Sequence, residues 1–511
     1  MGTSISNSGK PRTLRTDCSD FGLGSGREQL QKTISVGILT AAQVEFSLDG
    51  QNVIAATEQD GLVVIGGEAR PEWYFAAGAD CADTQRDTYS AYPSFMGEHF
   101  PESTEHQPVA RQAGSYFTLK NVEIGKGFHW QRYQDQSFPG DLRLIAREGK
   151  VIAINVVGIE DYLQCVIASE MSPTAGFEFL KAHAVISRSW LLAQLDKRDQ
   201  VREGYSSVEC DTPGELIRWQ DREDHQYYDF CADDHCQRYQ GIPQGNPAMI
   251  RKTRRVIEAT WGQVLWHGGR VCDARFSKCC GGALEEFKYC WEDKEVPYLK
   301  YARDYESVLP GGKRAPDGLL VAAGGESALA HPDLRDEQAA RRWIASNPRA
   351  FCNTRSRRLL GQVLKDYDSE TKDFYRWKVE YGAEELRQII LERTGDDYGQ
   401  ILDLIPLERG VSGRICRLKI VGTLKTKIIG KELEIRKTLS RSHLYSSAFV
   451  VEKAWGRGQS SSAARFVLHG AGWGHGVGLC QIGAAAMGAR GYNYQEILQH
   501  YYPGSTLKNI Y

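Results

Sequence analysis

One glutamate in the first half of the chain has the surroundings expected of a general acid. The segment 159–171, IEDYLQCVIASEM, has the pattern of a helix, and on it Glu170 shares an apolar stripe with Leu163 and Ile167. A carboxyl group on such a stripe is partly removed from water, which favours its protonated form and suits it to donate a proton near neutral pH. The simpler alternative is a glutamate at a helix end that pairs with a nearby cation.

Two basic residues share one face of the next predicted helix, residues 175–196. Lys181 and Arg188 are seven positions apart, and Ala184 and Leu191 lie on the same face. Charged groups on an apolar face need partners. Each is therefore expected to pair with a carboxylate or to hold a polar substrate, unless both side chains only extend their charged ends past the edge of the face.

A glycine-rich segment, GAGWGHGVGLCQIGAAAMGARG, occupies residues 470–491, and every second residue from 470 to 478 is glycine. This spacing lets the backbone approach another group closely and leaves Trp473 and His475 on alternate positions. A tryptophan and a histidine on one edge suit the wall of a sugar-binding or catalytic site. No Gly-Lys-Ser or Gly-Lys-Thr follows, so the segment is not a phosphate-binding P-loop.

The chain has 13 cysteines, and seven of them lie between residues 210 and 290. Such clustering predicts either a metal site or local disulfides. The candidate metal ligands are His225, Cys231 and Cys236, whose cysteine spacing is within that of zinc fingers. Cys279 or Cys280 could supply a further thiolate from a neighbouring strand, and Cys280 is the one we include. Disulfides in an exported chain, or buried thiols in a cytosolic one, are the alternatives.

The elements that position these residues are mixed. Short β-rich segments separated by Asp-Gly and Gly-Gly pairs occupy residues 34–66, whereas helical patterns occupy 159–196 and 479–501. The sequence therefore predicts an α+β fold, in which mostly antiparallel strands lie against helices.

The length of 511 residues, with 41% hydrophobic and 25% charged residues, is typical of a globular protein. We expect a flexible tail over residues 1–33 and one catalytic region over 34–511, with insertions at about 67–113 and 320–410. The formal net charge of −2 gives no basic field that would indicate nucleic-acid binding. No apolar run is long enough for a transmembrane segment, and the first residues lack the apolar core of a secretory signal.

Taken together, these segments resemble one family. In chain order, the matching blocks are VVGIEDYLQCVIASEMSP, LKAHAVISRSWLLAQL, ARFSKCCGG with VPYL, SGRICRLKIVG, and HGAGWGHGVGLCQIGAAAMGARGYNYQEILQHYYPG. They resemble the SpoIID/LytB family, which comprises peptidoglycan lytic transglycosylases of sporulation and relatives described as amidase enhancers. The chain departs from the family pattern at His183, Cys279, Cys280 and Cys480, where the family usually has glutamine or small residues.

The resemblance implies a lytic transglycosylase. Glu170 stands at the family's catalytic glutamate, where it would protonate the glycosidic oxygen between N-acetylmuramic acid (MurNAc) and N-acetylglucosamine (GlcNAc). The C6 hydroxyl of MurNAc would then attack C1, and the same carboxylate would accept its proton, which leaves a 1,6-anhydro end. The residues expected to bind substrate are Lys181, Arg188, Trp473, His475 and Gln481.

The resemblance also bears on cofactors and partners. Some clostridial members hold a zinc ion with one histidine and two cysteines, to which His225, Cys231 and Cys236 are similar in kind and spacing. Such a zinc would be structural, because the implied reaction requires no cofactor. The implied partners are peptidoglycan glycan strands and a cell-wall amidase, and this substrate implies the cell envelope or periplasm.

Two other functions stay open. A non-catalytic protein could bind glycan and stimulate a cell-wall amidase, but it would not need an acid at Glu170. A metal-dependent hydrolase could use the cysteine and histidine cluster, although the chain lacks a His-Glu-x-x-His motif. The leading prediction is therefore the lytic transglycosylase.

Overall fold

The computed structural model describes most of the chain. The described ranges are 32–48, 52–75, 116–125, 131–172, 174–202, 207–219, 225–233, 236–243, 246–305, 332–364, 373–455 and 463–511. Residues 1–31 of the predicted tail, 76–113 of the first predicted insertion and 320–331 of the second lie outside these ranges. The predicted domain boundaries stay predictions.

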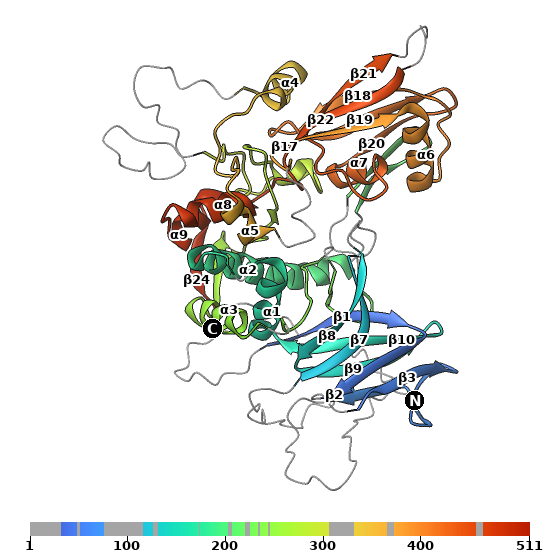
Figure 1. Ribbon diagram of the computed structural model, residues 1–511, viewed down its shortest axis with the longest axis vertical. Coiled ribbons are helices and arrows are strands. Elements are labelled where there is room, and N and C mark those ends of the chain that lie inside the picture. Colours follow the sequence, from blue (N-terminus) through green and yellow to red (C-terminus); the bar gives the residue numbers. More distant parts are fainter. Residues whose placement is uncertain are drawn as a thin grey trace, which may run out of the picture.

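Two mostly antiparallel sheets form one end of the molecule, drawn at the bottom of Figure 1. The first contains, in spatial order, β13 (Phe230–Cys231), β1 (Thr33–Ala41), β10 (Lys150–Gly158), β9 (Asp141–Arg147) and β6 (Glu72–Phe75). The second contains β5 (Glu68–Arg70), β4 (Leu62–Ile65), β3 (Ile54–Gln59), β2 (Gln43–Leu48), β7 (Tyr116–Ile124) and β8 (Arg132–Pro139). The sequence of β10, KVIAINVVG, is almost continuously apolar because nearly all of this strand is buried.

A helical layer follows directly on β10. Helix α1 (Ile159–Glu170) has two acidic residues in its first turn, where the helix dipole favours negative charge, and it ends where Met171 turns to an extended backbone. The long helix α2 packs against α1, α3, α8, α9 and β14. The bounds of this layer are α2 (Phe177–Arg202), α3 (Pro247–Ala259), α5 (Arg357–Val363), α8 (Gln481–Ala489), α9 (Tyr494–Tyr501), β14 (Gln263–His267), β15 (Arg270–Val271) and β24 (Thr506–Asn509).

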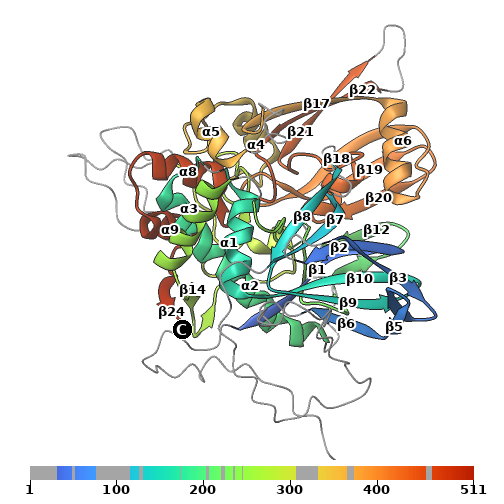
Figure 2. The same cartoon turned by 60° about the horizontal axis from the view of Figure 1, so that its bottom comes forward.

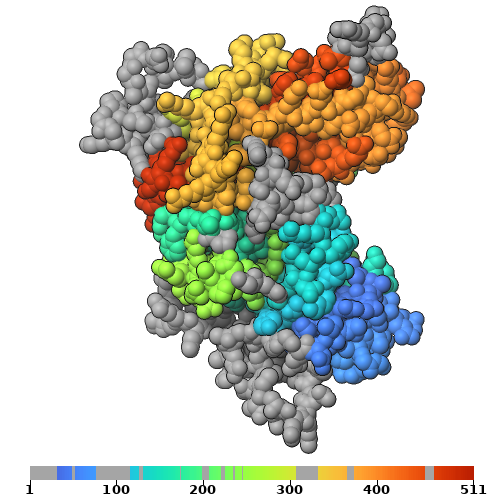
Figure 3. Space-filling model, in the orientation of Figure 1, coloured from blue at the N-terminus to red at the C-terminus, as the bar shows by residue number. Residues whose placement is uncertain are grey.

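Two further sheets form the opposite end of the molecule (Figure 1). One contains β11 (Val208–Asp211), β12 (Glu215–Arg218), β20 (Thr426–Gly430), β19 (Ile415–Gly422) and β18 (Ile401–Arg409). The other contains β17 (Arg376–Gly382), β22 (Ala463–Ala471) and β21 (Phe449–Trp455). The helices of this end are α4 (Glu337–Ala345), α6 (Ala383–Thr394) and α7 (Glu432–Thr438). Figure 3 shows this end in orange and the N-terminal strands in blue and cyan on the other side of the helical layer.

The glycine-rich segment joins the two ends. It follows β22 and leads through β23 (Leu479–Cys480), which pairs in parallel with β16 (Phe276–Ser277), into α8. Figure 2 shows α8 and α9 beside α2, which both helices contact. The structure confirms the predicted α+β fold, because the ladders are antiparallel except for β1–β13, β12–β20 and β16–β23 among the described strands.

Candidate functional site

A cavity of about 500 Å³ lies between the N-terminal sheets, the end of α1 and helix α7. Its aromatic lining residues are Trp190, Tyr239, Phe276 and Trp291, and its basic ones are Arg238, Arg275, Arg436 and Lys437. Its acidic lining residues are Glu123, Glu170, Asp233 and Glu432, and two histidines, His443 and His475, and two cysteines, Cys236 and Cys290, also line it. Aromatic faces combined with charged hydrogen-bonding groups are suited to a sugar polymer that carries carboxylate and amide substituents.

Glu170 is the last residue of α1, and its side chain reaches the wall of this cavity. The residue is only 8% exposed, and its Oε1 atom accepts a hydrogen bond of 3.3 Å from the backbone N–H of Arg238. The sequence argument placed this carboxyl on an apolar stripe, and the structure confirms that it is buried at the edge of the core. A proton donor in this position is shielded from bulk water but open to a ligand in the cavity.

The extended segment 237–240 holds the end of α1 in place. The backbone N–H of Gln240 donates to the Ser169 Oγ atom over 2.9 Å, next to the contact that Arg238 makes with Glu170. The Gln237 side chain donates to the backbone carbonyl of Ser187 on α2 over 3.2 Å. This segment therefore fixes Glu170 relative to both helices.

His475, one of the predicted substrate-binding residues, lines the cavity together with Glu170 and the predicted metal ligand Cys236. Burial lowers the pKa of its imidazole well below the usual value, and the nearby guanidinium groups of Arg275 and Arg414 act in the same direction. The neutral ring accepts a hydrogen bond of 3.1 Å at Nδ1 from the backbone N–H of Val477 and packs edge-on against Trp291, with ring centroids 4.9 Å apart. His475 is therefore a neutral wall residue and not a cation.

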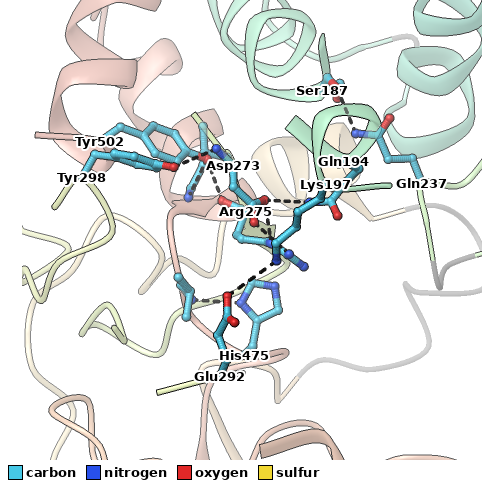
Figure 4. Close-up of polar contacts among 12 residues, drawn as sticks. Ser187, Gln194, Lys197, Gln237, Asp273, Arg275, Glu292, Tyr298, His475 and Tyr502 are labelled. Carbon is cyan, nitrogen blue, oxygen red and sulfur yellow. Dashed lines mark hydrogen bonds and ion pairs between the residues drawn. The ribbon is translucent and has the colours of Figure 1, made fainter. Parts of the chain in front are cut away.

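Arg275 was missed by the sequence reasoning, although it lies in the quoted block ARFSKCCGG. Its Nε atom donates to Asp273 over 2.7 Å, and its guanidinium lies 4.4 Å from the ring centroid of Trp291. Figure 4 shows Arg275 between Asp273 and His475, and the Tyr502 hydroxyl donates to the Arg275 backbone carbonyl over 2.6 Å. These contacts hold a cation over an aromatic face at the cavity wall.

The structure does not bring Lys181 or Arg188 to the cavity. Arg188 is fully buried, donates to Glu160 on α1 over 2.7 Å and to the backbone carbonyl of Gln263 over 2.9 Å. Lys181 pairs with Glu178 on its own helix, 2.6 Å away. Both cations therefore have protein carboxylates as partners, and their predicted role as substrate contacts stays a prediction.

Gln481 and Trp473 also lie outside the cavity lining. Gln481 is buried at the start of α8, and its Nε2 atom lies 3.2 Å from Nε2 of His183, whose Nδ1 lies 3.2 Å from the Ser187 hydroxyl. Burial lowers the pKa of His183 to about 3, so the ring is neutral and joins α8 to α2. Trp473 packs edge-on against Tyr445, with ring centroids 5.5 Å apart. We therefore infer that Gln481 and Trp473 support the cavity wall from behind and do not line it.

The predicted metal ligands fall into two separate groups. His225, Cys231 and Cys236 offer ligand atoms that all lie within 4.8 Å of one another, and the His225 Nε2 to Cys236 Sγ distance is 3.4 Å. One imidazole and two thiolates suit zinc with one further position. Cys280 does not belong to this group, because it lies with Asp304 and other cysteines in a second cluster. The prediction that Cys280 completes the first site is therefore wrong.

Comparison with known proteins fits this geometry. The sequence model of the family described as "Stage II sporulation protein", SpoIID, matches residues 147–267, which include Glu170 and the group of His225, Cys231 and Cys236. This match and the motifs quoted above support the resemblance of the chain to the SpoIID/LytB family. A second model, a domain of unknown function called DUF8618, matches residues 285–478, which include Trp473 and His475. Gln481 lies outside both matches.

Two relatives extend this comparison. The chain is 26% identical over 260 residues to the "Amidase enhancer" of Bacillus subtilis, a match that covers 50% of this chain and 32% of that protein. It is 23% identical over 365 residues to an uncharacterized protein of Brachyspira hyodysenteriae, with 71% and 70% of the two chains covered. The chain therefore spans about a third of the amidase enhancer. Among the described residues, no helix is long and apolar enough to cross a membrane.

Proposed function

We propose that this chain acts on the bacterial cell wall as a lytic transglycosylase that cleaves the MurNAc–GlcNAc β-1,4 bond of peptidoglycan glycan strands. The observation that carries the proposal is the carboxyl of Glu170, 8% exposed at the wall of the 500 Å³ cavity within the SpoIID match. The SpoIID match supports the cell-wall role, and the aromatic and basic lining supports a glycan ligand.

In this proposal Glu170 serves first as acid and then as base. Its proton passes to the glycosidic oxygen, the C1–O bond breaks through an oxocarbenium-like state, and the C6 hydroxyl of the same MurNAc attacks C1. The ionised carboxylate then accepts the hydroxyl proton, so protons balance without water as a reactant. The backbone N–H of Arg238 would hold the carboxyl in position through its hydrogen bond to Oε1.

The test is mass spectrometry of the products from peptide-free glycan strands. Wild type should release ends 18 Da lighter than hydrolytic ends, because water is not added, and Glu170→Gln should release none while folding normally. The matched control is Glu258→Gln, which removes an exposed carboxyl on α3 and should keep full activity. Ordinary reducing ends would refute the transglycosylase and favour a hydrolase with Glu432 or Asp233, which also line the cavity, as second carboxylate.

A second candidate function is a glycan-binding activator of a cell-wall amidase, which the name of the Bacillus subtilis relative favours. This candidate predicts that the folded chain cleaves no glycan but raises the rate at which an added amidase releases peptides from cell walls. It also predicts that Glu170→Gln keeps the stimulation. If stimulation disappears with Glu170→Gln, the activator proposal fails, because an activator needs no proton donor.

We also propose that His225, Cys231 and Cys236 hold a structural zinc ion. Zinc would supply a rigid crosslink here, and Cys236 directly precedes the segment that fixes Glu170. We expect Cys231→Ser/Cys236→Ser to lose one equivalent of zinc and to unfold at a lower temperature. Unchanged zinc content in that double variant would refute this site.

A further inference from the structure

A second group of potential metal ligands lies in the interior, away from the cavity lining. The thiols of Cys280, Cys352 and Cys480 and the carboxylate of Asp304 offer ligand atoms that all lie within 4.8 Å of one another. All four residues are at most 3% exposed. They come from the loop after β16, the loops on either side of α4 and the end of β23, so the fold and not local sequence brings them together.

The spacing of these atoms suits one tetrahedral ion. The Sγ atoms of Cys280 and Cys352 are 3.5 Å apart. Zinc–sulfur bonds of about 2.3 Å place two sulfurs of a tetrahedral site roughly 3.8 Å apart, so only a small adjustment is needed. A four-iron cluster would have to fit its own inorganic core between the cysteine sulfurs, and ligand atoms within 4.8 Å leave no room for it.

Backbone N–H groups point at two of the sulfurs. The N–H of Cys280 donates to the Cys480 Sγ atom over 3.3 Å, and the N–H of Gly483 donates to the same atom over 3.4 Å. The N–H of Gly282 donates to the Cys280 Sγ atom over 3.4 Å. Such donors stabilise negative charge on sulfur and are typical of the groups that surround metal-bound thiolates.

The carboxylate is oriented in the same way. The Asp304 Oδ2 atom accepts a hydrogen bond of 3.0 Å from the backbone N–H of Cys352, and Oδ1 accepts one of 2.8 Å from the hydroxyl of Tyr501. His500 Nε2 lies 3.5 Å from Oδ1 on the outer side. Asp304 is completely buried, and a buried carboxylate among thiols is stable when it is neutralised by a cation. A metal ion would supply that charge.

We propose that Cys280, Cys352, Cys480 and Asp304 bind one zinc ion, separate from the site of His225, Cys231 and Cys236. Three soft thiolates and one carboxylate form a closed tetrahedral set, which is the arrangement of a structural zinc site. This site does not depend on the proposed enzymatic function.

The zinc would fasten the glycine-rich segment. Cys480 lies five residues after His475, and the backbone groups of Cys279 and Trp473 exchange hydrogen bonds of 2.9 and 2.7 Å beside the cluster. Cys280 and Cys480 flank the DUF8618 match on its two sides, whereas Asp304 and Cys352 lie within it. One ion would therefore hold the two ends of this matched segment to its interior.

The test is zinc analysis of the purified full chain. Because Cys231→Ser/Cys236→Ser removes the first site, that double variant should still hold one zinc per chain. Adding Cys352→Ser to it should reduce zinc to background, whereas adding Cys272→Ser should not, because this buried thiol belongs to neither group of ligands. A double variant without zinc, or with iron in its place, would overturn the proposal.

Two further measurements keep the test decisive if Cys352→Ser fails to fold. Cobalt substituted into the double variant should give thiolate-to-cobalt absorption, and Asp304→Asn should shift its visible bands but keep three thiolate ligands. Peptide mapping without reductant should find Cys280 and Cys352 as thiols protected from alkylation until zinc is removed. A disulfide between them in the protein as purified would overturn the site.

Discussion

Glu285 offers a measurable link between pH and the stability of the glycine-rich segment. Its carboxylate is fully buried and accepts hydrogen bonds from the Ser412 hydroxyl at 2.7 Å and the Glu286 N–H at 2.9 Å. Its own backbone N–H donates to the carbonyl of Gly476 over 2.9 Å. Burial raises the pKa of this carboxyl from 4.5 to about 7, against the opposing effect of those hydrogen bonds.

The size of the effect follows from this shift. The difference between about 7 and 4.5 is 2.5 pH units, and at 1.36 kcal/mol per unit it corresponds to about 3 kcal/mol. The folded chain holds this proton more tightly than the unfolded chain does. The stabilisation is therefore complete below pH 4.5 and is lost as the pH rises through about 7.

The perturbation is Glu285→Gln, because glutamine resembles the protonated carboxyl and does not titrate. The free energy of unfolding is measured for both proteins by urea denaturation from pH 4 to 8.5. The wild-type value minus the variant value should be about 3 kcal/mol smaller at pH 8 than at pH 4.5. Glu258→Gln, which removes an exposed carboxyl, should show no such trend. A constant difference between wild type and Glu285→Gln across this range would refute the reasoning.

Wild type must be compared with Glu285→Gln because His183 changes stability with pH in the opposite direction to Glu285. Its pKa is lowered to about 3 by burial, so its contribution to stability is present above pH 6.5 and is lost as the pH falls toward 3. Between pH 4.5 and 6.5 the contributions of Glu285 and His183 to stability therefore change in opposite directions. Since both chains contain His183, its contribution cancels in the comparison.

Three other predictions concern packing and are measured by urea denaturation, with cleavage assays where stated. Arg188→Met should lower the free energy of unfolding by about 3–5 kcal/mol because Glu160 loses its buried partner. The double variant Glu160→Gln/Arg188→Met should recover part of this loss, and no recovery would contradict the pairing of the two residues. Gly478→Ala should destabilise the chain and impair glycan cleavage. The φ of Gly478 is +69°, and a Cβ there would lie 2.0 Å from the Arg275 carbonyl oxygen. Wild-type stability of this variant would contradict such a close approach. Tyr162→Phe should leave stability unchanged or raise it by about 1 kcal/mol, because this buried hydroxyl has no hydrogen-bond partner among the described residues; a large loss would show that it has a partner.

The sequence was informative where a pattern is local. The apolar stripe of residues 159–171 predicted both a helix and a shielded carboxyl, and α1 ends with Glu170 at the cavity. The same reasoning detected that Arg188 needs a partner. It could not identify that partner, because Glu160 lies 28 residues earlier on another helix and spacing within one helix says nothing about it.

The sequence analysis grouped the cysteines by their separation along the chain, and the fold groups them differently. Cys280 was assigned to the ligands before it in sequence, but in the fold it meets Cys352, 72 residues away, and Cys480, 200 residues away. Arg275 and Trp291 stand in loop segments without periodicity, so no pattern marked them as a pair. The only sequence signal for Arg275 was the block ARFSKCCGG, which resembles the family pattern. It indicated the segment but not this side chain.

The walls of the cavity have a consequence for how the protein is made. They extend from Ile38 on β1 to His475 after β22, so contacts between residues more than 400 positions apart must form before the cavity exists. Closing such long loops slows folding, and a chain emerging from the ribosome meets its last wall segment only near the end of synthesis. An excised fragment of residues 147–267 would carry Glu170 but lack Arg275, Trp291 and His475, and therefore could not rebuild the site on its own.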